Sequence, residues 1–222
     1  MTSSLNRLRT MFLKPQAFLK KRPAKAVGDR LYAACVAQAR QPVFYLDYGV
    51  EDAIGARFEL LCLHVSLVVL ALRAVPATDP RHDQAHETGQ ALFDAFLGAL
   101  DNTLREQGVG DLTVPKTMKK LGVVVYTRMK RWDDLWQADT PENPSSIDAR
   151  AAYAARTVFA GTELGEADND DESKIVETTP AILAFTTYID ATRRALAADA
   201  LMTGRTDWVA IPALDAPVAM EA

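Results

Sequence analysis

The chain has 222 residues, of which 49% are hydrophobic and 24% are charged, and its formal net charge is −4. This composition is ordinary for a soluble globular protein and too apolar for a disordered one, and the length suits one domain with a well-filled core. No stretch reaches the roughly 18 uninterrupted apolar residues that a membrane-spanning helix needs, so we expect any membrane contact to be peripheral.

The net charge is unevenly distributed along the chain. Residues 1–26 contain seven basic residues and no acidic one, so the rest carries −11, which is −4 less seven positive charges. We predict a mobile basic tail able to lie on an anionic membrane surface, where each Lys or Arg adds about 1 kcal/mol. A merely solvated tail and a mitochondrial-type presequence share this composition. The residues assigned to membrane contact are Arg7, Arg9, Lys14, Lys20, Lys21 and Arg22.

Two elements are predicted before position 50. Apolar residues at helical spacing predict a first helix over residues 26–40, which Gln41-Pro42 ends because a residue before proline disfavours helix. A short aromatic segment follows over residues 43–50, and Gly49 closes it.

A central helix is predicted next. Glu51 and Asp52 are expected to begin it, because acidic side chains favour the positive end of the helix dipole, and it should run to about Arg73. Leucine and valine fill nearly every side of residues 60–72, so we expect this helix to be buried at the centre of the fold.

The second half of the chain continues the helical pattern. Glycines and prolines punctuate apolar stripes at helical spacing, and these predict helices over residues 84–107, 114–137, 146–159 and 180–202. An acidic loop occupies residues 160–179, and the tail over residues 205–222 is expected to pack as an extended strap. The predicted fold is an all-α, single-domain orthogonal bundle of about six helices, with the domain over residues 27–204.

The chain offers no complete catalytic or metal-binding set. Cys35 and Cys62 lie on apolar helical faces without metal-ligand spacing, so we interpret them as reduced core thiols. His82 and His86 are four residues apart, but no third ligand accompanies them. The acidic run 168–172 lacks the spacing and the glycine of a calcium loop. We therefore expect no metal, no cofactor and no enzyme activity.

Basic residues gather on the helix over residues 114–137. An RNA or an anionic partner would suit such a strip, but the acidic body argues against general nucleic-acid binding, and a solvated helix face is the default interpretation. The residues concerned are Lys116, Lys119, Lys120, Arg128, Lys130 and Arg131.

Several short motifs together resemble the ubiquinol-cytochrome c chaperone family. The first group is Leu31-Tyr32, Phe44-Tyr45, Tyr48-Gly49-Val50, Asp52, Gly55, Arg57-Phe58-Glu59 and Leu63-His64. The second is Leu92-Phe93-Asp94 with Leu104-Arg105-Glu106-Gln107-Gly108-Val109-Gly110-Asp111-Leu112. The resemblance covers about residues 28–135 well and thins beyond them, and Arg57 in place of a tryptophan indicates a bacterial member.

The resemblance implies a non-enzymatic assembly factor for the cytochrome bc1 complex, which binds newly made cytochrome b, apo or newly haemylated, at the cytoplasmic side of the inner membrane. Because the body of the chain is acidic, we expect no specific nucleic acid as a partner. The residues we assign to client binding are Tyr45, Tyr48, Asp52, Arg57, Phe58, Glu59 and His64. For Phe58 and His64 a core role is the alternative, because exposed apolar patches are rare on soluble domains.

Two other functions remain open from the residues alone. A helical enzyme or binding protein for an isoprenoid-like lipid would need matched acidic motifs around one cavity, which Asp133-Asp134 and Asp170-Asp171 do not provide as a pair. A ribosome-binding or nucleic-acid-binding adaptor would use the basic head, and its binding would weaken steeply with added salt.

Overall fold

The computed structural model describes residues 22–138, 146–160 and 177–214, and within these ranges the chain is all-α without a strand. The predicted fold class is thereby confirmed. Six longer helices and two one-turn helices occur in the described ranges: α2 (Arg22–Ala39), α3 (Pro42–Leu46), α4 (Ile54–Arg73), α5 (His82–Glu106), α6 (Val114–Gln137), α7 (Ser146–Thr157), α8 (Pro180–Ala195) and α9 (Ala198–Met202).

Some of the predictions fall outside the described residues. These include most of the basic head with Arg7, Arg9, Lys14, Lys20 and Lys21, and most of the acidic loop with Asp170-Asp171. The end of the tail, from residue 215, also falls outside. Arg22 is described only as the first backbone position of α2.

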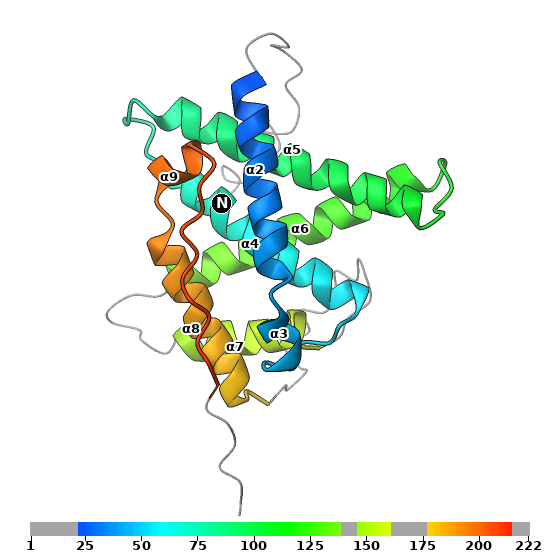
Figure 1. Ribbon diagram of the computed structural model, residues 1–222, viewed down its shortest axis with the longest axis vertical. Coiled ribbons are helices and arrows are strands. Elements are labelled where there is room, and N and C mark those ends of the chain that lie inside the picture. Colours follow the sequence, from blue (N-terminus) through cyan, green and yellow to red (C-terminus); the bar gives the residue numbers. More distant parts are fainter. Residues whose placement is uncertain (1–21, 139–145, 161–176, 215–222) are drawn as a thin grey trace, which may run out of the picture.

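Helix α4 forms the centre of the bundle (Figure 1). It packs against α2, α5, α6, α8 and α9, and leucines and valines on nearly all of its sides are buried. It is long and apolar enough by composition to cross a membrane, but most of it is enclosed by the other helices. The predicted central helix is therefore confirmed as the core of the fold, because apolar burial is the main favourable term in folding.

Helix α2 crosses α5 at close range, as Figure 1 shows. The crossing is made at Gly28, where an added Cβ would lie 2.5 Å from the backbone carbonyl carbon of Ala91. Glycine has no side chain beyond the backbone, so it allows the two helix backbones to approach this closely. The contact fixes the first helix of the described chain against the longest one.

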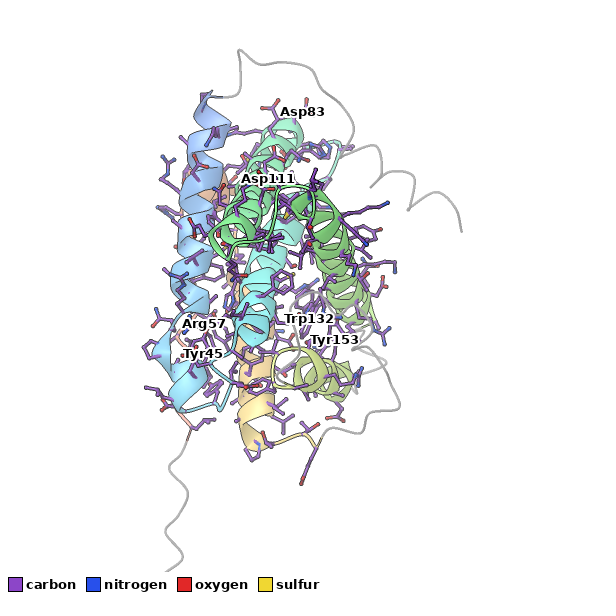
Figure 2. The ribbon with its side chains drawn as sticks, turned by 90° about the vertical axis from the view of Figure 1, so that its right-hand side faces the viewer. Tyr45, Arg57, Asp83, Asp111, Trp132 and Tyr153 are labelled. Atoms are coloured by element: carbon purple, nitrogen blue, oxygen red, sulfur yellow. The ribbon has the colours of Figure 1, made fainter. Side chains whose placement is uncertain are left out.

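A buried polar cluster joins α6, α7 and α8. Asp190 accepts hydrogen bonds from Arg150 Nε at 3.0 Å, Arg150 Nη2 at 2.7 Å and Trp136 Nε1 at 2.9 Å. Trp132 stacks on Trp136 with ring centroids 5.2 Å apart and meets Tyr153 edge-on at 5.0 Å. Figure 2 shows Trp132 and Tyr153 side by side between α6 and α7. Charged groups buried in this way need full pairing, so the cluster holds the three helices in one arrangement.

Several predicted boundaries differ from the structure. Helix α2 begins at Arg22, so the predicted end of the tail at residue 26 falls inside this helix. The prediction of one helix over residues 180–202 is wrong, because Leu196 adopts an extended conformation with ψ of 108° and separates α8 from α9. Leu183, on α8, is 37% exposed.

The strap, residues 205–214, runs back along α8 after α9, as Figure 1 shows. Tyr48 Oη donates to the carbonyl oxygen of Pro212 at 2.7 Å, and the Trp208 ring meets the His64 ring edge-on at 5.5 Å. Ile211 and Leu214 pack against the hydrophobic core. The predicted extended strap is confirmed over these residues.

Candidate functional site, an exposed corner between α3 and α4

Helix α3 is a single turn that starts at Pro42, whose fixed φ suits a first helical position. Its Phe44 side chain is completely buried and meets the rings of His64, Phe185 and Tyr188. The chain then reverses at Gly49, whose φ of 76° favours glycine, and Val50 N–H donates to the carbonyl oxygen of Phe44 at 3.0 Å. The expected aromatic segment is therefore a helical turn anchored by one phenylalanine.

The start of α4 differs from the prediction. The helix begins at Ile54, and its N-cap residue, Ala53, offers no side-chain hydrogen bond. Asp52 lies before the helix and accepts a hydrogen bond from Arg57 Nε at 2.5 Å. That hydrogen bond lowers the pKa of Asp52 below its usual range. The acidic residue expected to begin the helix instead forms an exposed ion pair with its first turn.

Two large apolar side chains lie exposed at the two ends of the connection between α3 and α4. Leu46, the last residue of α3, is 80% exposed, and Ile54, the first of α4, is 58% exposed. Tyr45 is half-buried, and its hydroxyl donates to the carbonyl oxygen of Ala39 at 2.9 Å. Figure 2 shows Tyr45 and Arg57 close together at this end of the bundle. We call Tyr45, Leu46, Asp52, Ile54 and Arg57 the α3–α4 corner.

The structure divides the predicted client-binding residues into two groups. Tyr45, Asp52 and Arg57 belong to the α3–α4 corner. The other four are buried beneath it and have no free surface for a client in this conformation: Tyr48, Phe58, Glu59 and His64. For the buried four, the core alternative raised for Phe58 and His64 matches their positions, and a role in client binding stays a prediction.

His64 occupies a buried chain of hydrogen bonds under the corner. Its Nδ1 lies 2.7 Å from the carbonyl oxygen of Leu60, so this nitrogen donates. Its Nε2, 3.1 Å from Tyr188 Oη, then accepts from that hydroxyl, which itself accepts from Gln38 Nε2 at 2.8 Å. Burial lowers the pKa of His64 to about 4 and raises that of Tyr188 to about 12. Both side chains are therefore neutral near pH 7.

Glu59 and Arg128 form a buried ion pair between α4 and α6. Arg128 Nε lies 3.1 Å and 3.0 Å from the two carboxylate oxygens. Burial raises the pKa of Glu59, and the attraction of Arg128 opposes that rise. This pair also corrects the predicted basic strip, because Arg128 faces the core and only Lys116, Lys119, Lys120 and Lys130 are exposed there, with Arg131 half-buried.

The remaining candidates for chemistry do not converge. Cys35 and Cys62 are free and buried, and burial raises the pKa of both thiols. His82 Nδ1 lies 2.9 Å from the carbonyl oxygen of Val75, and Asp134 pairs with Lys130 on α6. In the part of the chain that the structure describes, no group of three or more His, Cys, Asp or Glu side chains is placed to hold a metal ion.

Sequence reasoning missed Leu46 and Ile54 because leucine and isoleucine at the ends of helices ordinarily indicate core. A signal was available, since Leu46 directly precedes the polar residue Asp47 and Ile54 follows the acidic pair Glu51-Asp52 with only Ala53 between them. For apolar residues at the end of a helix, next to a turn, tertiary packing and not helical periodicity decides whether the side chain is exposed.

The fold and this corner define an all-helical protein whose candidate site is a surface. A family model described as ubiquinol-cytochrome C chaperone matches residues 46–208, so the chain belongs to this family. The matched region reaches further toward the C-terminus than the resemblance noted in the motifs and begins after Phe44-Tyr45.

A solved structure supports the same assignment. The chain is similar to the crystal structure of the Cbp3 homolog from Brucella abortus, with 26% identity and a TM-score of 0.63. The alignment covers 93% of this chain and 97% of that chain. The comparison with curated proteins finds no match.

Proposed function

We propose that this protein is a non-enzymatic assembly chaperone of the cytochrome bc1 complex that binds newly made cytochrome b. The observation that carries the proposal is membership of the ubiquinol-cytochrome C chaperone family over residues 46–208. The likeness to the Cbp3 homolog along 93% of the chain supports it.

The α3–α4 corner is the proposed client-binding surface. Leu46 and Ile54 offer apolar area that a client segment can remove from water, worth about 25 cal/mol for each Å² buried. The Asp52–Arg57 pair beside them is solvent-exposed and contributes little to folding, so it is free to re-pair with a charged client group. An apolar centre flanked by charges is the usual anatomy of a protein interface.

We further propose that the protein works on the cytoplasmic side of the inner membrane as a peripheral protein. Burial of α4, the described helix most suited by composition to cross a bilayer, favours peripheral association over insertion. The basic residues of the head would supply attraction to anionic lipid.

The function is tested in a strain that lacks the gene. Assembled bc1 complex, measured by native gels and by the haem b absorbance of membranes, is expected to fall strongly, and the wild-type chain should restore it. A tagged chain is expected to recover cytochrome b from solubilised membranes after crosslinking. Normal bc1 levels in the deletion strain would sink the proposal.

The binding surface is tested with variants of the α3–α4 corner. Leu46→Asp with Ile54→Asp should reduce recovery of cytochrome b at least about tenfold, because two apolar contacts are replaced by charges. Arg57→Glu should also weaken recovery, while the thermal midpoint stays nearly unchanged because exposed ion pairs contribute about 0–1 kcal/mol.

Two matched controls separate this surface from general effects of charge. Leu183→Asp changes an exposed leucine on α8, and Lys25→Glu breaks the exposed Lys25–Asp29 pair on α2. Neither change should alter recovery of cytochrome b. If the controls and the corner variants behave alike, the α3–α4 corner is not the client-binding surface.

A further inference from the structure

The turn between α5 and α6 presents a further exposed apolar residue, far from the α3–α4 corner along the chain. Leu112 is 98% exposed, the highest exposure among the large hydrophobic side chains that the structure describes. Figure 1 shows that this turn projects beyond the rest of the bundle. A leucine left wholly in water forgoes the free energy of its burial, which a partner outside the chain would recover.

The turn is held in place by its own contacts. Arg105 binds Asp101 on α5 through Nε at 2.7 Å and Asp111 in the turn through Nη1 at 2.5 Å. Val109 N–H donates to the carbonyl oxygen of Leu104 at 3.1 Å, and Val109 packs against the core. Thr113 N–H donates to the carbonyl oxygen of Gly110 at 2.7 Å. These contacts keep Leu112 pointing outward.

The surface next to Leu112 is basic. From residue 114 to residue 131, α6 contains no acidic residue, and its Lys116, Lys119 and Lys120 side chains are exposed. These lysines lie within about three helical turns of Leu112, because an α-helix has about 3.6 residues per turn. Val123, on the following turn, is 53% exposed. Of the acids near this turn, Asp101 and Asp111 are paired with Arg105, and Glu106, the last residue of α5, is exposed.

We propose that this α5–α6 surface, made of Leu112, Lys116, Lys119, Lys120 and Val123, docks the protein on an anionic lipid bilayer. Leu112 enters the interfacial region, and the three lysines contact the lipid headgroups around it, as interfacial segments with basic and aliphatic residues do. The exposed apolar residues are aliphatic, which suits lipid better than RNA, whose bases stack on aromatic side chains.

This site deepens the peripheral membrane association proposed above and assigns it to a surface separate from the basic head. It uses residues that neither the client-binding corner nor the buried clusters require. Binding of the purified protein to vesicles is measured without cytochrome b, so its failure leaves the chaperone function untouched, and failure of the chaperone function leaves the vesicle result untouched.

The experiment is co-sedimentation of the full chain with phosphatidylcholine vesicles, with and without phosphatidylglycerol. The wild-type chain should bind only the anionic vesicles. Lys116→Gln with Lys119→Gln and Lys120→Gln should weaken that binding roughly a hundredfold, since each lysine near the surface is worth about fivefold. Leu112→Ser should weaken it roughly tenfold and should leave the salt dependence unchanged.

The matched control removes three exposed positive charges elsewhere, by changing Arg40, Arg194 and Arg205 to glutamine. It should retain most of the vesicle binding. Equal weakening by the control and by the lysine variant would overturn the proposal, because attraction would then follow net charge alone. Unchanged vesicle binding in the lysine variant would also overturn the proposal. So would a lysine variant that still binds vesicles but no longer binds a single-stranded RNA that the wild-type chain binds.

Discussion

His64 shows how the surroundings of one residue set its charge. Its two ring nitrogens are both occupied, one by the carbonyl oxygen of Leu60 and the other by the hydroxyl of Tyr188. The rings of Phe44 and Trp208 cover it on further sides. A proton on Nε2 would break the bond from Tyr188 and place a charge in an apolar core, which is why burial lowers its pKa.

This arrangement predicts a pH-dependent stability. The pKa of His64 is about 4 in the folded chain against an ordinary value of 6.5, so below pH 6.5 the unfolded state binds a proton that the folded state does not. The free energy of unfolding therefore falls as pH is lowered through this window, by about 2 kcal/mol between about pH 7 and about pH 5. His64→Gln removes the titrating group. The free energy of unfolding of this variant should therefore fall by about 2 kcal/mol less than that of the wild-type chain over the same pH interval.

Urea unfolding of both chains near pH 7 and near pH 5 measures the difference. The comparison is between pH dependences, so a lower overall stability of the variant does not affect it. Identical pH dependences would show that His64 is protonated in the folded chain as readily as in the unfolded one.

Arg128 is a residue whose burial and ion-pair partner could not be predicted from the sequence. The sequence places Arg128 on the same helix as the basic lysines, yet it pairs with Glu59 inside the core. The pairing partners are 69 residues apart in sequence, so no local pattern reports them. Helical periodicity identified the buried leucines and valines of α4, but it cannot say which charged residue a distant helix will neutralise.

At the scale of elements, the contact between α2 and α5 depends on a missing side chain. Gly28 places the two backbones so close that an added Cβ would meet the main chain of Ala91 at 2.5 Å. Main-chain atoms of two packed helices cannot move aside as the end of a flexible side chain does. One of the helices would have to shift, and the apolar contacts on both sides of the crossing would loosen with it.

Gly28→Ala is therefore expected to destabilise the protein by about 1–3 kcal/mol, although alanine is the better helix former. Gly98→Ala, on α5, is the matched control, because an added Cβ there meets nothing within 4 Å. It should stabilise the protein by up to about 1 kcal/mol. Thermal and denaturant unfolding distinguish the two, and a stabilised Gly28→Ala chain would show that the crossing is looser than described.

The helices themselves were largely predictable from the sequence, and their ends were less so. The range 114–137 matches α6 at both ends, since Pro115 suits the first turn of a helix. The break at Leu196 was missed because the residues around it are alanines and arginines, which favour helix on their own. The short helix α9 packs against α4 and α5, so tertiary contacts and not local preference place the break.

At the scale of the whole molecule, the strap and the C-cap of α9 before it tie the end of the described chain to its beginning. Pro212 accepts a hydrogen bond from Tyr48, which lies directly beneath the α3–α4 corner, and Arg30 Nη2 on α2 donates to the carbonyl oxygen of Thr203 at 3.2 Å. The corner is thus held by residues more than 150 positions away in sequence. The sequence motifs around the α3–α4 corner indicate the family, but the shape of the corner depends on the strap as well.

Trp208 provides the test of this closure. It is half-buried against His64, and its indole N–H has no hydrogen-bond partner among the described residues. Trp208→Ala should lower stability by about 2 kcal/mol through lost apolar contact, whereas Trp208→Phe, which keeps an aromatic ring and removes the unpaired donor, should cost less than about 1 kcal/mol. Circular dichroism during urea unfolding measures both values.

The same two variants connect the strap to function. Loosening the strap leaves the Tyr48 hydroxyl without its acceptor and removes support from beneath Leu46 and Ile54, so Trp208→Ala should also reduce recovery of cytochrome b. Trp208→Phe should retain it. Equal recovery by both variants, at a temperature where both remain folded, would mean that the α3–α4 corner keeps its shape without the strap, and that the long-range tie serves stability alone.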